Sequence, residues 1–186
     1  MKTYFSYAIG LTVFWFGSAA LASETRVVIN LSEQKALLIQ HGKVTLVSPI
    51  ASGKTGCSTP TGNFRIFDKD IDHHSRSFGL VINAYGTVVN PNATANSRVP
   101  RGCHYEAAPM PYFMEFSPAV GMHAGYLPGY PASHGCVRMP RDLALLFFER
   151  VQVGTPVAVV GSTNNLSRLR RAIPVSPAGS YVVNKR

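Results

Sequence analysis

The stretch from residue 123 to residue 138 constrains this chain more than any other. It reads His-Ala-Gly-Tyr-Leu-Pro-Gly-Tyr-Pro-Ala-Ser-His-Gly-Cys-Val-Arg. Glycines and prolines interrupt its middle, so no regular helix or strand is expected to run through it: Gly125, Pro128, Gly129 and Pro131. Two histidines and one cysteine on such a loop indicate function more strongly than the same residues within an apolar run.

Cys136 is the candidate nucleophile and His123 the candidate base. A cysteine attacks as the thiolate, which is scarce at neutral pH without a neighbouring base or cation. The turn residues between them allow the loop to fold back and bring the two side chains together. Pro140 is expected to begin a helix whose N-terminal dipole favours the thiolate, and Arg138 adds positive potential. Gly135 would let backbone N–H groups converge as an oxyanion hole.

The alternative is a buried structural thiol with both histidines on the surface. Cysteine, histidine, arginine and turn residues all fall within positions 123–138, which favours the catalytic interpretation.

The rest of the chain reads mainly as strands. Apolar alternation and β-branched residues predict strands over residues 26–31, 35–40, 43–52, 63–68, 77–83, 110–116 and 155–160. The first three form an antiparallel meander, and residues 90–102 read as a loop. A helix is predicted over 140–151, because Pro140 suits a first turn and Leu143, Leu146 and Phe147 share one face.

Residues 1–22 are predicted to be a signal peptide. Lys2 supplies the positive region, residues 7–19 the apolar run, and Ala20-Leu21-Ala22 the cleavage site. The alternative is an uncleaved signal anchor. The remainder is expected to form one exported domain, located in the periplasm or the cell wall.

The formal net charge is +9, and part of it lies at the C-terminus. Residues 162–186 carry five basic residues and no acidic one: Arg168, Arg170, Arg171, Lys185 and Arg186. We expect a basic, disordered tail, since the segment shows no periodicity. An exported basic protein is expected to meet anionic wall polymer or a membrane surface rather than nucleic acid. The alternative is a solvated tail without a specific partner.

Export also bears on the three cysteines, Cys57, Cys103 and Cys136. In an oxidising compartment two of them can pair, and the sequence alone allows three pairings or none. A Cys57–Cys103 disulfide is the expected pairing, because it leaves Cys136 free.

Neither a phosphate-binding loop nor a metal site is expected. Residues 53–62 superficially resemble a phosphate-binding loop but lack its spacing and are followed by no helix. Asp70, Asp72, His73 and His74 could ligate a metal, but no second cluster has a matching spacing. We interpret them as an exposed polar loop, and we expect no cofactor.

Two segments resemble a known family. Residues 133–138, Ser-His-Gly-Cys-Val-Arg, with His123 upstream, resemble the signature of the L,D-transpeptidase catalytic domain. Gly53-Lys54 and the Thr-Pro-Thr-Gly-Asn-Phe-Arg-Ile of residues 59–66 resemble its second hallmark. The resemblance covers residues 25–161. It implies a mainly β fold, a mixed β-sandwich or open barrel, with one helix packed on it after the cysteine. The domain would span residues 23–161.

The resemblance also implies a reaction. Cys136 would attack a peptidoglycan stem peptide at the L-centre of a diamino acid and expel D-Ala. The thioester would pass to an amine, either of a second stem, giving a 3→3 cross-link, or of a wall-attached protein. His123 would take the thiol proton, and the main-chain carbonyl of Ala124 would orient the imidazole.

The remaining roles implied by the resemblance concern substrate binding. Backbone groups of His134, Gly135 and Cys136, beside Ser133, would form the oxyanion site. Arg138 would hold the loop or face a stem carboxylate. Tyr112 and Tyr126 would line the cleft.

Three other functions remain open from the sequence. The same site could act as an L,D-carboxypeptidase or hydrolase, with water as acceptor. A zinc hydrolase could use several of the histidines: His73, His74, His104, His123 and His134. The chain could also be a non-catalytic wall-binding module.

Overall fold

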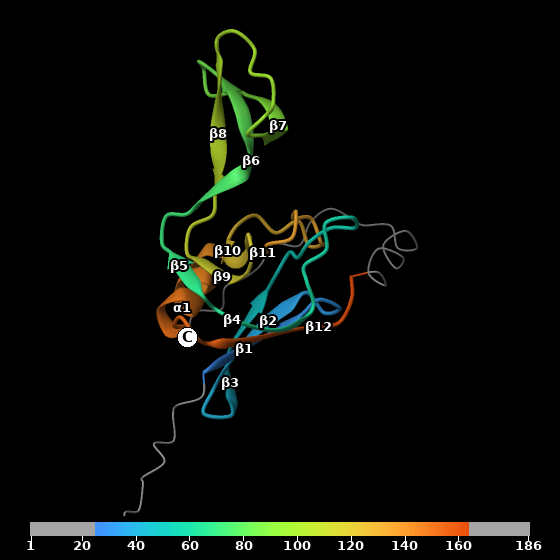
Figure 1. Ribbon diagram of the computed structural model, residues 1–186, viewed down its shortest axis with the longest axis vertical. Helices are drawn as coiled ribbons and strands as arrows, with labels where there is room; N and C mark the ends of the chain where they lie inside the picture. Colours follow the sequence, from blue (N-terminus) through green and yellow to red (C-terminus); the bar gives the residue numbers. More distant parts are fainter. Residues whose placement is uncertain (1–24, 164–186) are drawn as a thin grey trace, which may run out of the picture.

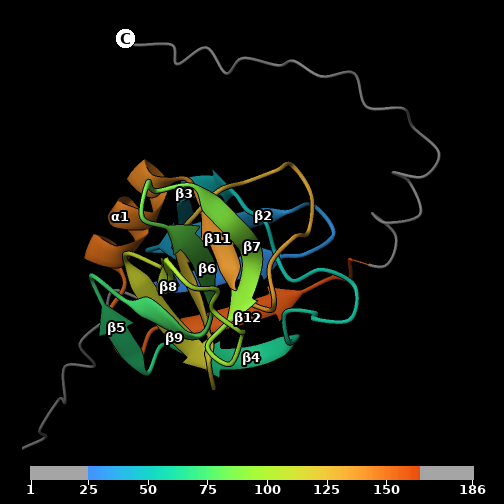
Figure 2. The same ribbon diagram turned by 90° about the horizontal axis from the view of Figure 1, so that it is seen from above.

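The structure, a computed structural model, describes residues 25–163, which form three β-sheets and one helix (Figures 1 and 2). The largest sheet has the order β3-β2-β1-β12-β4. Its strands are β1 (Arg26–Asn30), β2 (Lys35–Gln40), β3 (Lys43–Pro49), β4 (Gly62–Arg65) and β12 (Pro156–Val160). β1 and β12 run parallel, and the other pairs are antiparallel.

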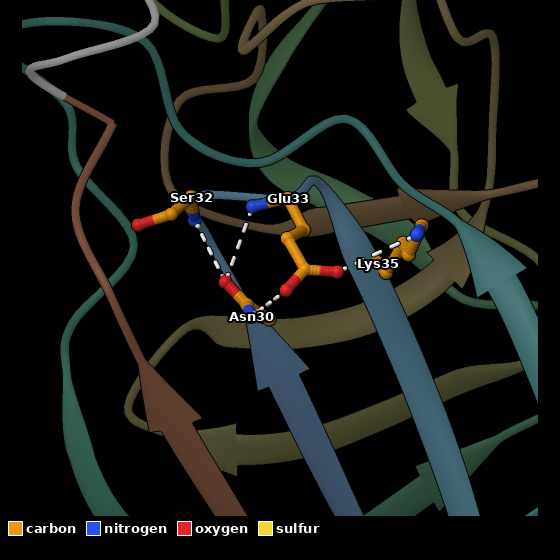
Figure 3. Close-up of polar contacts among 4 residues, drawn as sticks. All are labelled: Asn30, Ser32, Glu33 and Lys35. Carbon is orange, nitrogen blue, oxygen red and sulfur yellow. Dashed lines mark hydrogen bonds and ion pairs between the residues drawn. The ribbon is translucent and has the colours of Figure 1, made fainter.

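The turn from β1 to β2 is held by a single side chain (Figure 3). Asn30 Oδ1 accepts hydrogen bonds from the backbone N–H groups of Ser32 (3.0 Å) and Glu33 (3.1 Å). Its Nδ2 donates to Glu33 Oε1 at 3.0 Å, and Glu33 Oε2 lies 3.4 Å from Lys35 Nζ. Asparagine commonly closes turns in this way, so residues adjacent in sequence are enough to fix the turn between the first two strands of the meander.

A second, four-stranded sheet carries the loop that the sequence singles out. Its order is β11-β10-β9-β5, with strands β5 (Asp68–Asp70), β9 (Phe113–Ser117), β10 (Val120–Ala124) and β11 (Val137–Met139). β10 and β11 are parallel. The loop therefore leaves one strand and returns to its neighbour, which keeps the two ends of the stretch together.

The two sheets enclose one core. Buried side chains of both sheets meet there with those of the helix α1 (Arg141–Arg150), which packs against β10. The largest fully buried members of this core are Ile29, Leu38, Ile66, Met114, Met122, Met139 and Phe147. The predicted mainly β fold with one helix after the cysteine is confirmed, as a sandwich of mixed sheets rather than a closed barrel.

A third sheet stands away from this sandwich (Figure 1). Its order is β7-β6-β8, with strands β6 (His74–Asn83), β7 (Val88–Thr94) and β8 (Cys103–Pro109). The expected loop at 90–102 is therefore wrong in its first part, and β8 was not predicted. Residues 88–94 include polar side chains and Pro91, and most of them are exposed, so no apolar alternation marks the strand.

Other boundaries differ by a few residues. The third strand ends at Pro49 instead of residue 52, and Ala51 and Gly53 form isolated bridges with Arg138 and Ser133. The predicted strand 63–68 divides into β4 and β5, which belong to different sheets. The helix lies within its predicted range.

The predicted Cys57–Cys103 disulfide is wrong, because all three cysteines are free thiols. Cys103 pairs with Asn83 at the end of β8 that lies away from the sandwich (Figure 1). Cys57 lies in a turn closed by its own N–H and Lys54 O, in the segment that bridges to Ser133. The third sheet thus carries Cys103 away from Cys57.

Within residues 25–163 no helix is long and apolar enough to cross a bilayer. The predicted signal peptide and almost all of the predicted tail lie outside the described residues.

Candidate active site

The alternation of β10 and β11 decides which side chains face outward. Met122 pairs with Val137, and both are buried in the core. Because successive side chains of a strand point to opposite faces, His123 and Arg138, the next pair, face away from that core. Cys136 lies two residues before Arg138 on the same face. Cys136 and His123 therefore line the same cavity.

A cavity of about 590 Å³ opens on this face. Six of the predicted site residues line it: His123, Tyr126, Ser133, His134, Cys136 and Arg138. Side chains from β5, β6 and β9 complete its wall. Ala124 and Gly135 are buried behind it and contribute backbone groups.

His123 is only 5% exposed, and its ring is oriented by the backbone. Nδ1 lies 2.8 Å from the carbonyl oxygen of Ala124. A carbonyl only accepts hydrogen bonds, so Nδ1 carries the proton and Nε2 is the free base. Burial lowers the pKa of His123 to about 4, and Arg138 and His73 add to that effect, whereas the Ala124 hydrogen bond opposes it. The imidazole is therefore neutral near pH 7.

Cys136 is a thiol rather than a thiolate in this setting. Burial raises its pKa, and Glu115 adds to the increase, while the backbone of Gly121 and the charge of Arg138 oppose it. Sγ lies 3.7 Å from the carbonyl oxygen of Ala119. The thiol therefore needs a base to remove its proton before sulfur can attack.

The helix dipole contributes little at this sulfur. β11 separates Cys136 from α1, and three residues of strand span roughly 10 Å. The dipole effect falls off within the first turn of a helix. Arg138 does lower the pKa of Cys136 as expected, but burial outweighs it.

The turn of residues 133–136 is held by a serine. Ser133 Oγ accepts the N–H of Gly135 at 3.0 Å and donates to the carbonyl oxygen of Cys136. Gly135 has φ +127°, a conformation that favours glycine. The N–H of Gly135 was expected to be one of the oxyanion donors. It already donates to Ser133 Oγ, so it is not available for that role.

Thr59 supports the same turn and was not singled out from the sequence. It is 2% exposed, and its Oγ1 accepts the N–H of Gly53 at 2.9 Å and donates to the carbonyl oxygen of Gly135 at 2.7 Å. The Thr59 hydroxyl therefore joins the two segments that resemble the family hallmarks, which are also joined by the bridge between Gly53 and Ser133. Thr59 begins the second segment that resembles the family, and this position is the sequence feature that could have pointed to it.

His134 lies between two partners on the exposed side of the turn. Lys54 Nζ lies 3.0 Å from its Nε2, and since an ammonium only donates, the imidazole is neutral. Partial burial, followed by Lys54 and Arg138, lowers its pKa. Phe78 of β6 stacks on the ring, with centroids 4.2 Å apart and planes at 12°. No sequence pattern indicated this contact from the third sheet.

Of the two tyrosines expected to line the cleft, only Tyr126 does so. Tyr126 is 78% exposed and lines the cavity. Tyr112 packs against Phe148 of α1, with centroids 5.9 Å apart, and Arg141 lies over its ring. The expectation that Tyr112 lines the cleft is therefore wrong, because its ring covers the helix instead.

The expected exposed loop at residues 70–74 is more ordered than predicted. Asp70 ends β5 and His74 begins β6. His73 is half-buried, stacks on Phe113 and borders the cavity. Among the described residues no three histidine, cysteine or acidic side chains gather closely enough to hold a metal ion, so these offer a zinc hydrolase no ligand set.

Residues 24–159 match the YkuD family, the L,D-transpeptidase catalytic domain. The chain is similar to L,D-transpeptidase 1 of Mycobacterium tuberculosis, with 26% identity over 137 residues. The match covers 72% of this chain and 49% of that protein, so the chain spans about half the length of the curated relatives it matches.

Solved structures share the fold. The catalytic domain of the E. faecium L,D-transpeptidase is 26% identical with a TM-score of 0.52, covering 74% of this chain and 98% of that one. The L,D-transpeptidase LdtMt1 in complex with imipenem is 22% identical with a TM-score of 0.55, covering 74% of this chain and 59% of that one.

Proposed function

Because the chain belongs to the L,D-transpeptidase catalytic domain family, we propose that it is a cysteine transpeptidase acting on peptidoglycan stem peptides. Cys136 attacks the carbonyl at the L-centre of the diamino acid. The peptide bond breaks, D-Ala leaves through its amine, and a thioester remains on the enzyme. An amine of a second stem, or of a wall-attached protein, then takes the acyl group.

One observation carries this proposal. Cys136, directly before β11, and His123 of the neighbouring strand β10 line one cavity, and Nδ1 of His123 is committed to the Ala124 carbonyl. The imidazole therefore presents its basic Nε2 to chemistry in the cavity. A buried structural thiol would require no such oriented base.

The electrostatics place the proton transfer during the attack and not before it. With the pKa of Cys136 raised and that of His123 lowered, both groups are neutral before substrate binds. His123 takes the thiol proton as sulfur bonds to the carbonyl carbon and later delivers it to the departing amine of D-Ala. The backbone of Gly121 and the charge of Arg138 stabilise the thiolate character that develops.

The oxyanion and the stem carboxylate need partners as well. With Gly135 N–H held by Ser133, we assign the oxyanion to the N–H groups of His134 and Cys136. Arg138 and the exposed Tyr126, which line the same cavity, are the proposed contacts for the stem peptide.

Intact mass spectrometry with stem tetrapeptide tests the proposal. The wild-type protein should gain the mass of the tripeptide acyl group, and Cys136→Ala should gain none. Cys57→Ala is the matched control and should acylate like wild type. Peptide mapping that places the adduct on Cys57 or Cys103 would overturn the assignment. Because LdtMt1 forms a complex with imipenem, imipenem serves as a second probe.

Product analysis separates transfer from hydrolysis at the same site. Cross-linked dimers from purified muropeptides support transfer, whereas free tripeptides alone would establish an L,D-carboxypeptidase.

We also propose export, on the basis of Lys2 and the apolar residues 7–19. N-terminal sequencing of the protein from a periplasmic fraction should begin at residue 23. A protein recovered with its first residues intact in the cytoplasm would contradict this.

A further inference from the structure

A second histidine borders the cavity that holds Cys136. His73 lies in the short connection between β5 and β6, far in sequence from the segment 123–138. Its side chain is 19% exposed, and Nδ1 lies 3.1 Å from Asp70 Oδ2. Neither residue has a part in the acylation described above.

The ring of His73 is fixed on two sides. It stacks on Phe113, with centroids 4.2 Å apart and planes at 11°. Its backbone carbonyl accepts the N–H of Met110 at 2.7 Å. Since a carboxylate oxygen only accepts, Asp70 holds the proton on Nδ1 and leaves Nε2 as the basic nitrogen. The ring of His73, like that of His123, is therefore oriented by a hydrogen bond at Nδ1.

Phe113 separates the two imidazoles. Its ring centroid lies 4.2 Å from that of His73 and 6.3 Å from that of His123. The two imidazoles therefore border one cavity from different segments of the chain, His123 from β10 and His73 from the connection between β5 and β6. A substrate group bound there can reach one imidazole while its neighbouring atoms reach the other.

The charges around the cavity are divided between strands. Asp68 and Glu115 are directly paired between β5 and β9, and with Asp70 they place carboxylates on the side of His73. Like charges directly opposite in a strand pair are unfavourable, so this wall suits a cation. The arginines that line the cavity, Arg76 and Arg138, come from β6 and β11.

The second half of a transpeptidation needs a base of this kind. An acceptor amine is an ammonium ion near pH 7 and cannot attack until it has lost one proton. It loses another when its nitrogen bonds to the thioester carbonyl. His123 can pass that second proton to the departing sulfur, which restores the thiol. The first proton needs a different acceptor.

We propose that His73, positioned by Asp70, takes the first proton from a primary ammonium group bound at the Asp68–Glu115 wall, which makes this wall the acceptor side of the cavity. This inference rests on the proposed function. The proton then leaves His73 for solvent, so the step is balanced. The chemical class of the acceptor is a primary amine.

Two small nucleophiles of similar size test this. Methylamine is an ammonium ion at pH 7, whereas hydroxylamine is already largely neutral. Acyl-enzyme formed with stem tetrapeptide is mixed with each nucleophile, and loss of the thioester is followed by intact mass. In His73→Asn, which keeps a donor for Asp70, transfer to methylamine should fall about 10²-fold, the usual scale for a general base. Transfer to hydroxylamine and the rate of acylation should stay within about twofold of wild type.

Two further variants sharpen the result. His74→Asn is the matched control, because His74 is exposed and its Nδ1 contacts the backbone of Asp72. It should behave like wild type with both nucleophiles. Asp70→Asn should show a smaller loss that is again confined to methylamine, and it tests the inference independently if His73→Asn does not fold.

Equal losses with both nucleophiles, or a parallel loss of acylation, would assign His73 a merely structural role. An unchanged rate with methylamine would also overturn the inference while leaving the proposed function intact. Failure of the wild-type protein to acylate at Cys136 would instead refute the proposed function.

Discussion

At the scale of single residues, two hydroxyl groups hold the turn of residues 133–136, which carries Cys136. Thr59 and Ser133 each accept one backbone N–H and donate to one backbone carbonyl, and together they tie Gly53, Gly135 and Cys136. A hydroxyl that both donates and accepts can join two backbone segments in this way.

Replacing Thr59 with valine tests this link. The side chain keeps its shape, but Gly53 N–H and Gly135 C=O lose their partner in the protein interior. We expect the free energy of unfolding to fall by roughly 1–3 kcal/mol, because a buried polar group is left unsatisfied. Urea denaturation measures this, and imipenem acylation should slow as the turn loosens. Thr45→Val, at an exposed hydroxyl, is the control and should change little.

The proposed base, His123, predicts how acylation depends on pH. Only its neutral form accepts a proton, and burial lowers its pKa to about 4. Activity should therefore persist below pH 6 and decline as the pH falls through about 4, since protonation then removes the base. The measurement is kcat/KM for stem tetrapeptide against pH, which reports the free enzyme. An acidic limb close to the ordinary histidine pKa of about 6.5 would contradict this description of the site.

That His123 and Cys136 line the same cavity was predictable, because both belong to one short stretch whose two ends are held together by the pairing of β10 with β11. Thr59 and Phe78 were not, because each reaches the 133–136 turn from a distant segment through one hydrogen bond or one ring contact. The pKa of Cys136 was also beyond prediction, since burial decides its direction and burial depends on the whole fold.

At the scale of elements, α1 is held to the sheet by a lysine. Lys69 Nζ donates to the carbonyl oxygens of Phe148 and Val151, both at 2.6 Å, and lies 4.2 Å from the centre of the Phe148 ring. The last carbonyls of a helix have no partner within the helix and carry partial negative charge. Lys69 therefore satisfies the end of α1 from β5.

Substitution of Lys69 by methionine should expose this contribution. The unbranched apolar side chain of methionine can still pack on Phe148, but two carbonyls at the helix end lose their donor. We expect a loss of roughly 2 kcal/mol in the free energy of unfolding, measured by urea denaturation. Lys35→Met removes only an exposed ion pair with Glu33 and should cost no more than about 1 kcal/mol. Equal effects of the two substitutions would refute the capping role.

Most strands that face the core were predicted, but β10 and β11 were not, although Met122, Val137 and Met139 are buried there. Of the third sheet only part of β6 was predicted. β1, β2 and β12 alternate buried and partly exposed residues, which is the pattern that a sequence displays. In the third sheet the fully buried apolar side chains are Val81 and Ala93, and both lie outside the main core cluster. β7 and β8 are held by backbone pairing with β6. Backbone pairing produces no periodic pattern of apolar residues in the sequence.

At the scale of the whole molecule, the first and last described strands, β1 and β12, pair with each other. β12 lies between β1 and β4, so the last strand joins β4 to the rest of the largest sheet. Beyond it, Ser162 exchanges hydrogen bonds with Ser32, and Thr163 is buried. The predicted domain end at residue 161 remains a prediction, but these contacts extend two residues further.

Truncation at two points separates the contribution of β12 from that of residues 164–186. A chain that ends after Thr163 keeps β12 and its contacts with Ser32, so it should unfold cooperatively in urea and acylate with imipenem within about twofold of the full chain. A chain that ends after Gly154 lacks β12, which leaves unpaired edges on β1 and β4 and removes Val157 and Val159 from the core. It should show no cooperative transition. Loss of acylation in the first chain would mean that residues 164–186 contribute to the site, and a folded second chain would show that the sheet forms without β12.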